Sequence, residues 1–95
     1  MITSKQRSAL RSLSNNIKPL FQIGKENVGE NLIKQLDEYL ELHEIVKVRI
    51  LQSADVGAKE TCAEIADKLK AEPVSAVGST FVIYRRSKEN PVIEL

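Results

Sequence analysis

The chain has 95 residues, of which 42% are hydrophobic and 28% charged, and its formal net charge at pH 7 is +1. This composition is typical of a globular protein, and the length suffices for a single domain over residues 1–95 but not for two. No apolar run approaches the roughly 18 residues that span a bilayer, so we expect no membrane segment.

Residues 4–14 are predicted to form a first helix. T-S-K-Q at 3–6 fits a capping box with Thr3 as the N-cap, and Pro19 prevents continuation of the helix. Apolar residues share one helix face at 3.6-residue spacing: Ala9, Leu10 and Leu13, and Ile17 continues this stripe beyond the helix. Arg7 and Arg11 share another face, and Lys18 continues that line.

Lys5, Arg7 and Arg11 interrupt any apolar core of a signal peptide. Cys62 is the only cysteine, so an internal disulfide cannot form. Both observations favour a reducing, cytoplasmic setting.

Residues 20–23 are predicted to form a short strand, followed by the loop G-K-E-N at 24–27. Gly29 stands where a helix N-cap is expected, with Glu30 in the first turn. The predicted second helix, about residues 30–42, has an apolar stripe and an acidic outer face. The stripe consists of Leu32, Ile33, Leu36, Tyr39 and Leu40.

The second half of the chain continues the alternation of helices and strands. Residues 45–51 alternate as a strand, with Lys47 and Arg49 on the side opposite Val46, Val48 and Ile50. A third helix is predicted over residues 57–70, and Pro73 marks its end. Residues 74–77 and 80–86 read as a hairpin around Gly78-Ser79. The tail after residue 86 has no clear partner.

The predicted order is therefore α-β-α-β-α-β-β. A small four-stranded mixed sheet with helices packed on it, in the α+β (α/β) class with two layers, is the natural arrangement.

An enzyme is the weakest functional hypothesis. Cys62 lies on the apolar stripe of the third helix, where a buried and inert thiol is expected, and His43 ends the second helix, where a cation suits the dipole. They are the only soft metal ligands in the chain, so we expect no metal site. No dinucleotide or Walker motif is present. We therefore expect no catalytic residue and no cofactor.

The loop Gly24, Lys25, Glu26, Asn27 is a better candidate site. Glycine without a side chain lets another backbone approach, Lys25 supplies a charge, and the next helix offers unpaired N–H groups at its positive end. An ordinary βα turn has the same composition. A G-x-x-G-like loop that enters a helix resembles the clamp with which KH domains hold a nucleic-acid backbone.

The distribution of charge favours a nucleic-acid partner. Residues 1–25 carry five basic side chains and no acidic one, whereas residues 26–46 carry six acidic side chains and one lysine. Solvated helix faces would produce the same pattern. Further cations on separate elements are Arg49, Arg85, Arg86 and Lys88. Few aromatic residues are present, which favours recognition of folded RNA by shape and backbone over stacking on single strands.

Three blocks of sequence together resemble the CRM domain (chloroplast RNA splicing and ribosome maturation), in its small bacterial stand-alone form. They are I-G-K-E-N at 23–27, H-E-I-V-K-V at 43–48 and G-S-T-F-V-I-Y-R at 78–85. The resemblance implies a compact RNA-binding domain similar to the C-terminal domain of a bacterial translation initiation factor. It also implies an association with precursors of the large ribosomal subunit. Asn27 stands where the family usually has a second glycine.

The sequence thus predicts a monomeric RNA-binding protein that acts on ribosomal RNA during large-subunit (pre-50S) assembly. Its predicted contacts are Gly24, Lys25, Glu26, Asn27, Arg7, Arg11, Lys18, Arg49, Arg85, Arg86 and Lys88. The alternative is a protein-interaction module that binds a basic ribosomal protein through the acidic second helix.

Overall fold

The computed structural model describes residues 2–25 and 28–93. Helices and strands follow in the predicted order: α1 (Ser4–Ser14), β1 (Phe21–Ile23), α2 (Glu30–His43), β2 (Ile45–Ile50), α3 (Ala58–Leu69), β3 (Glu72–Val77) and β4 (Thr80–Tyr84). The α+β class and the element order are confirmed. The capping box of α1 is also confirmed, because Thr3 Oγ1 accepts from the Gln6 N–H and Gln6 Oε1 accepts from the Thr3 N–H.

The strands form one mixed sheet in the order β1-β2-β4-β3. β1 runs parallel to β2, and the other two pairs of neighbours are antiparallel. α2 provides the crossover that a parallel pair requires. The predicted hairpin turns at Gly78-Ser79, where Gly78 has a φ of 59°, a left-handed conformation that favours glycine.

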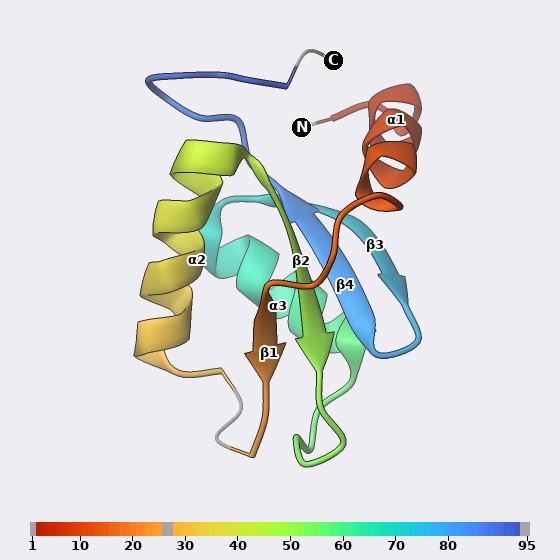
Figure 1. Ribbon diagram of the computed structural model, residues 1–95, viewed down its shortest axis with the longest axis vertical. Helices are drawn as coiled ribbons and strands as arrows, with labels where there is room; N and C mark the ends of the chain where they lie inside the picture. Colours follow the sequence, from red (N-terminus) through yellow and green to blue (C-terminus); the bar gives the residue numbers. More distant parts are fainter. Residues whose placement is uncertain (1, 26–27, 94–95) are drawn as a thin grey trace.

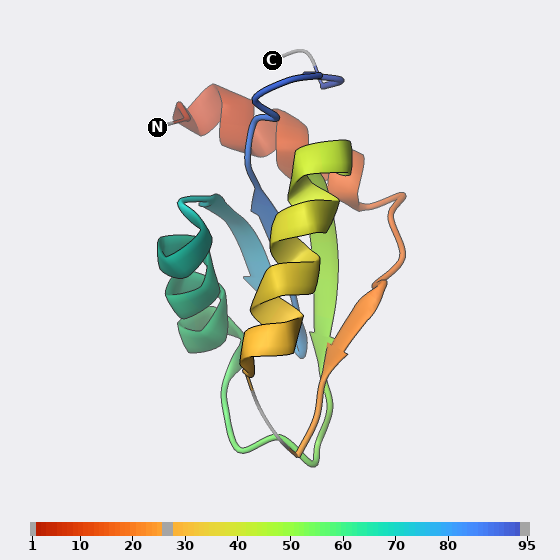
Figure 2. The same ribbon diagram turned by 90° about the vertical axis from the view of Figure 1, so that its left-hand side faces the viewer.

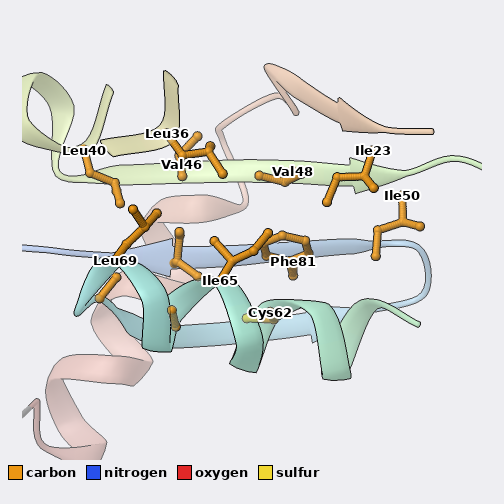
Figure 3. Packing of buried hydrophobic residues seen from close by; sticks show 13 residues of the cluster. Ile23, Leu36, Leu40, Val46, Val48, Ile50, Cys62, Ile65, Leu69 and Phe81 are labelled. Atoms are coloured by element: carbon orange, nitrogen blue, oxygen red, sulfur yellow. The ribbon is translucent and has the colours of Figure 1, made fainter. Parts of the chain in front are cut away.

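Helices α2 and α3 cover one face of the sheet, and α1 lies against the other face at one end (Figures 1 and 2). The main core lies under α2 and α3, where side chains of both helices point at the inward residues of β2 and β4 (Figure 3). The predicted stripes of α2 and α3 are confirmed, because their apolar residues belong to this cluster or pack against it.

A second cluster lies on the opposite face, beneath α1. Its buried members are Leu10, Ile45, Val74, Val82 and Tyr84. The predicted stripe of α1 is therefore wrong in part, because Ala9 and Leu13 are exposed. The helix meets the sheet along one line only, through Leu10 and Ser14, which is a single i, i+4 pair.

Strand β3 begins two residues earlier than predicted. Helix α3 ends at Leu69 because Lys70 adopts the left-handed conformation (φ 55°) as its C-cap. Pro73 therefore lies within the strand, not merely after the helix, and it is tolerated there because β3 is an edge strand with a register shift between Pro73 and Ser75.

Candidate nucleic-acid interface

One end of the molecule is formed by the loop after β1 and the beginning of α2. A hollow of about 630 Å³ lies there, which we call the loop hollow. It is lined by Gln22, Gly24, Lys25, Gly29, Glu30, Asn31 and Leu32. The predicted contacts Glu26 and Asn27 lie outside the described residues.

The beginning of α2 suits an anion in this hollow. Gly29 is the N-cap, as predicted, and it supplies no side-chain hydrogen bond to the helix. The N–H groups of the first turn have no acceptor within a helix, and they carry the positive end of its dipole. Lys25 is exposed beside them. The loop hollow therefore combines backbone donors with an exposed positive charge, and both suit a phosphate.

Gly24 packs against the neighbouring loop after β2. A Cβ added at Gly24 would lie 3.5 Å from Ser53 Oγ and 3.6 Å from Leu51 Cδ1, which is ordinary van der Waals distance. Within the described chain, no contact at Gly24 demands the absence of a side chain. A substitution of Lys25 is therefore a better test of whether the loop binds a ligand than a substitution of Gly24.

The basic residues of the N-terminal segment differ in their surroundings. Arg11 and Lys18 are exposed, on α1 and on the segment that links α1 to β1. Arg7 is half-buried, and its Nε donates to the carbonyl oxygen of Pro73 at 3.1 Å. Arg7 therefore has a structural role at the edge of β3 in addition to its charge.

Arg49 lies on the face of the sheet that α2 and α3 leave uncovered. The buried residues of β2 that face those helices are Val46, Val48 and Ile50. Lys47 and Arg49 point the other way; Lys47 is half-buried and Arg49 exposed. Lys47 was not among the predicted contacts, although its alternation with Arg49 was visible in the sequence.

Arg85 is used within the fold. Its Nη1 lies 2.6 Å from Asp37 Oδ1 and donates to the Leu69 carbonyl oxygen at 3.1 Å, and its Nη2 donates to the Asp37 carbonyl oxygen at 2.9 Å. The guanidinium thus ties the end of β4 to α2 and to the last turn of α3. Little of its side chain, 17%, remains exposed for a ligand.

Arg86 and Lys88 are exposed but follow the end of β4, at the end of the sheet away from the loop hollow (Figure 1). The structure therefore does not gather all of the predicted cations into one patch. Lys25 lines the loop hollow and Arg49 pairs in register with Gln22, which also lines it, whereas Arg86 lines a separate hollow with Ile2 and Ile93.

Two acidic residues at the end of α2 hold the C-terminal tail. Glu44 is fully buried and accepts hydrogen bonds from the N–H groups of Ser87 (2.7 Å), Val92 (2.6 Å) and Ile93 (2.7 Å). Burial acts to raise the pKa of Glu44, but these donors and the Arg86 charge outweigh it and leave the pKa below its ordinary value. The tail therefore has a partner that the sequence did not reveal.

Glu41 supports the same tail. Its Oε2 accepts from the Ser87 hydroxyl at 2.7 Å and from the Lys88 N–H at 3.1 Å. The Ser87 hydroxyl is the main cause that lowers the pKa of Glu41. Since Asp37, Glu41 and Glu44 all bind parts of this chain, a basic protein partner finds few free carboxylates on the C-terminal half of α2.

The aromatic rings are used in packing. Phe21 and Tyr39 meet edge to face with ring centroids 5.6 Å apart, and Tyr39 lies 4.2 Å from the ring of His43. Phe81 and Tyr84 are buried on opposite faces of β4. These are all the Phe and Tyr residues of the chain, which has no Trp.

The remaining candidates for chemistry are the Cys62 thiol and sets of metal-ligating side chains. Burial raises the pKa of the Cys62 thiol to about 11, so this thiol is a poor nucleophile. Among residues 2–25 and 28–93, no group of three His, Cys, Asp or Glu side chains could hold a metal ion. The same residues include no helix that is long and apolar enough to cross a membrane.

Comparison with known proteins gives matches along nearly the whole chain. The family model of the CRS1 / YhbY (CRM) domain matches residues 2–85. The "Probable RNA-binding protein YqeI" of Bacillus subtilis is 39% identical over 95 residues, which is 100% of this chain and 99% of that protein. An "RNA-binding protein" of Haemophilus influenzae is 28% identical over 89 residues, covering 93% of this chain and 89% of that protein.

A solved structure agrees with this fold. The solution structure of the hypothetical protein SAV1595 from Staphylococcus aureus is 48% identical in sequence and superposes with a TM-score of 0.83. The match covers 100% of this chain and 99% of that one.

Proposed function

The chain belongs to the CRS1 / YhbY (CRM) domain family, and on that premise we propose that it is an RNA-binding protein without catalytic activity. The observation that carries the proposal is similarity over the full length to a Bacillus subtilis protein whose name describes RNA binding. The loop hollow supports it, because backbone donors and Lys25 there suit a phosphate.

The proposed RNA is ribosomal RNA of the large subunit or its precursor, bound in the cytoplasm by a monomer. This follows from the family resemblance of the three sequence blocks. Lys25 with its loop and Arg49 are the proposed contacts at and beside the loop hollow. Lys18 and Arg11 are proposed contacts farther from it, on the same side of the sheet as Arg49. Arg86 and Lys88 would reach only an RNA that extends to the opposite end, and Arg85 is assigned to the fold.

The first test is the replacement Lys25→Ala, measured as the affinity for a structured RNA at several salt concentrations. We expect about tenfold weaker binding. The slope of log affinity against log salt concentration should fall in magnitude by about one, because one phosphate contact is lost. The unfolding midpoint should not change, since the side chain is exposed.

The matched control is Lys68→Ala, which removes the same charge from α3. Lys68 pairs with Glu64 at 3.3 Å, and both side chains are about half exposed, so its loss should cost the fold little. Equal affinities of the two variants would remove Lys25 and its loop from the site. Wild-type protein that fails to bind structured RNA even at low salt would contradict the whole proposal.

A further inference from the structure

One part of the sheet has no covering element among the described residues. α1 lies over the second face near the end of β4, the linking segment 15–20 passes across the middle of β4 and β2 to reach β1, and the part nearer the loop hollow stays open (Figure 1). The strand register places one residue of each strand in a row across this part: Gln22, Arg49, Thr80 and Val77. We call this row and Lys47, the next outward residue of β2, the open sheet face.

The side chains of the open sheet face suit a polyanion. Gln22, Arg49 and Val77 are exposed, and Thr80 and Lys47 are partly exposed. None of these residues is acidic, and all except Val77 carry a hydrogen-bond donor. Neighbouring strands lie about 4.8 Å apart, and Lys47 and Arg49 lie about 7 Å apart along β2. The two cations therefore face the same side within one short span.

The open sheet face continues from the loop hollow. Gln22 belongs to the row and also lines the hollow beside Gly24 and Lys25. The opposite side of the molecule is unsuited to RNA, because the outer surfaces of α2 and α3 carry more acidic than basic residues. One ligand bound in the hollow would thus be directed across the sheet and away from the helices.

The side chains of the open sheet face also indicate which kind of RNA would bind there. Proteins that bind single strands stack the bases on exposed aromatic rings. The open sheet face carries no aromatic residue, because Phe81 points into the main core and Tyr84 lies beneath α1. Amide, hydroxyl and guanidinium donors match the phosphates and 2′-hydroxyls that a helical RNA presents along its shallow groove.

We propose that the open sheet face binds the sugar–phosphate backbone of a helical RNA segment, with Arg49 as its central phosphate contact and Lys47 as the second. This inference rests on the proposed function and adds to it a binding surface and a preference for double-helical RNA. Gln22 and Thr80 lie on either side of Arg49 and would contact ribose hydroxyls.

The test measures binding of two labelled probes, an RNA hairpin with a stem of about 16 base pairs and a single strand of the same length. The variants are Arg49→Gln, Lys47→Gln and the control Lys68→Gln. We expect Arg49→Gln to bind the hairpin about tenfold more weakly. Its slope of log affinity against log salt concentration should be smaller in magnitude by about one. Lys47→Gln should show the smaller loss, and Lys68→Gln should match the wild type.

Arg49→Lys provides a further readout, because it keeps the charge and loses the planar fork of donors. It should keep the salt dependence of the wild type while binding more weakly. If Arg49→Gln binds the hairpin as tightly as Lys68→Gln while Lys25→Ala is impaired, the open sheet face is no contact surface, although the proposed function stands. A single strand bound as tightly as the hairpin would overturn the preference for helical RNA. Failure of the wild type to bind either probe would overturn both proposals.

Discussion

Glu44 combines a left-handed backbone with a fully buried carboxylate. Its φ of 68° ends α2, and its side chain binds three N–H groups of the tail, from Ser87, Val92 and Ile93. A non-glycine residue in this conformation and a buried charge are both unfavourable alone. Here the hydrogen bonds offset both costs, so this one side chain fixes a helix end and the C-terminal tail together.

The replacement Glu44→Gln should lower the free energy of unfolding by about 2–3 kcal/mol. The amide is nearly the same size, but its NH₂ group would face backbone N–H donors that need an acceptor. Urea unfolding followed by circular dichroism would measure the change. A loss below about 0.5 kcal/mol, which is typical of surface substitutions, would show that the three bonds contribute little.

The variant Glu44→Gln also shows how much of the acid sensitivity of folding stability comes from Glu44. Because the folded pKa of Glu44 lies below the unfolded value, its stabilisation is present above the unfolded pKa and is lost as pH falls through the folded pKa. Wild-type stability should therefore decrease on acidification below about pH 4.5, and Glu44→Gln should decrease less. Glu41, whose pKa is also lowered, would contribute to the slope that remains in Glu44→Gln.

Residue chemistry could be predicted from the sequence where it depends on local spacing. The burial of Cys62 follows from its helix stripe and needs no knowledge of distant partners. The role of Glu44 could not be predicted in this way, because Ser87 and Ile93 lie 43 and 49 residues away. For the same reason Arg85 was interpreted as a contact for RNA, whereas it binds Asp37 in α2.

At the scale of elements, the hairpin between β3 and β4 depends on one backbone angle. Gly78→Ala should destabilise the protein by about 1 kcal/mol, because its φ of +59° is strained for a residue with a Cβ. Apart from Gly78 and its two chain neighbours, no described residue has an atom within 4 Å of the added Cβ, so the loss would come from the backbone.

Gly24→Ala is the control for this substitution. The φ of Gly24 lies outside the left-handed region, and the added Cβ would lie at ordinary van der Waals distance from its neighbours, 3.5 Å from Ser53 Oγ. Thermal unfolding of both variants should therefore show the larger decrease for Gly78→Ala. Equal thermal unfolding midpoints for the two variants would show that the left-handed conformation of Gly78 does not determine stability.

The elements themselves were predictable to within two residues at their ends. The stripes of α2 and α3 were clear because each helix buries a broad face against the sheet. The buried face of α1 was harder to predict, because this helix contacts the end of the sheet along one line and Leu13 stays 43% exposed. A periodic pattern thus predicts a helix better than it predicts how much of that helix is buried.

At the scale of the whole molecule, the charges are divided between two sides. α1 and the linking segment, which carry Arg11 and Lys18, cover the side of the sheet on which β2 presents Arg49, whereas the acidic helices α2 and α3 lie on the other. The sequence showed that basic and acidic segments alternate. It could not show which of them share a side, because that depends on the strand order β1-β2-β4-β3.

This division predicts how the protein should behave in a cell lysate. On a sucrose gradient at low salt, we expect it to migrate with the large ribosomal subunit or its precursors, and to return to the top as salt is raised. Lys25→Ala should leave the particles at lower salt than Lys68→Ala. Protein that stays at the top at every salt concentration would contradict the proposed ribosomal partner, while leaving RNA binding to be judged by the purified probes.

The two edge strands of the sheet, β1 and β3, are poorly suited to pair with strands of another copy of the protein. β1 has only three residues, and β3 contains Pro73, which has no N–H to donate, beside a shift in register. Arg7 already occupies the Pro73 carbonyl oxygen. Neither border therefore offers a long, regular row of free donors and acceptors on which another copy could continue the ladder. The protein should resist fibril growth even when it is concentrated.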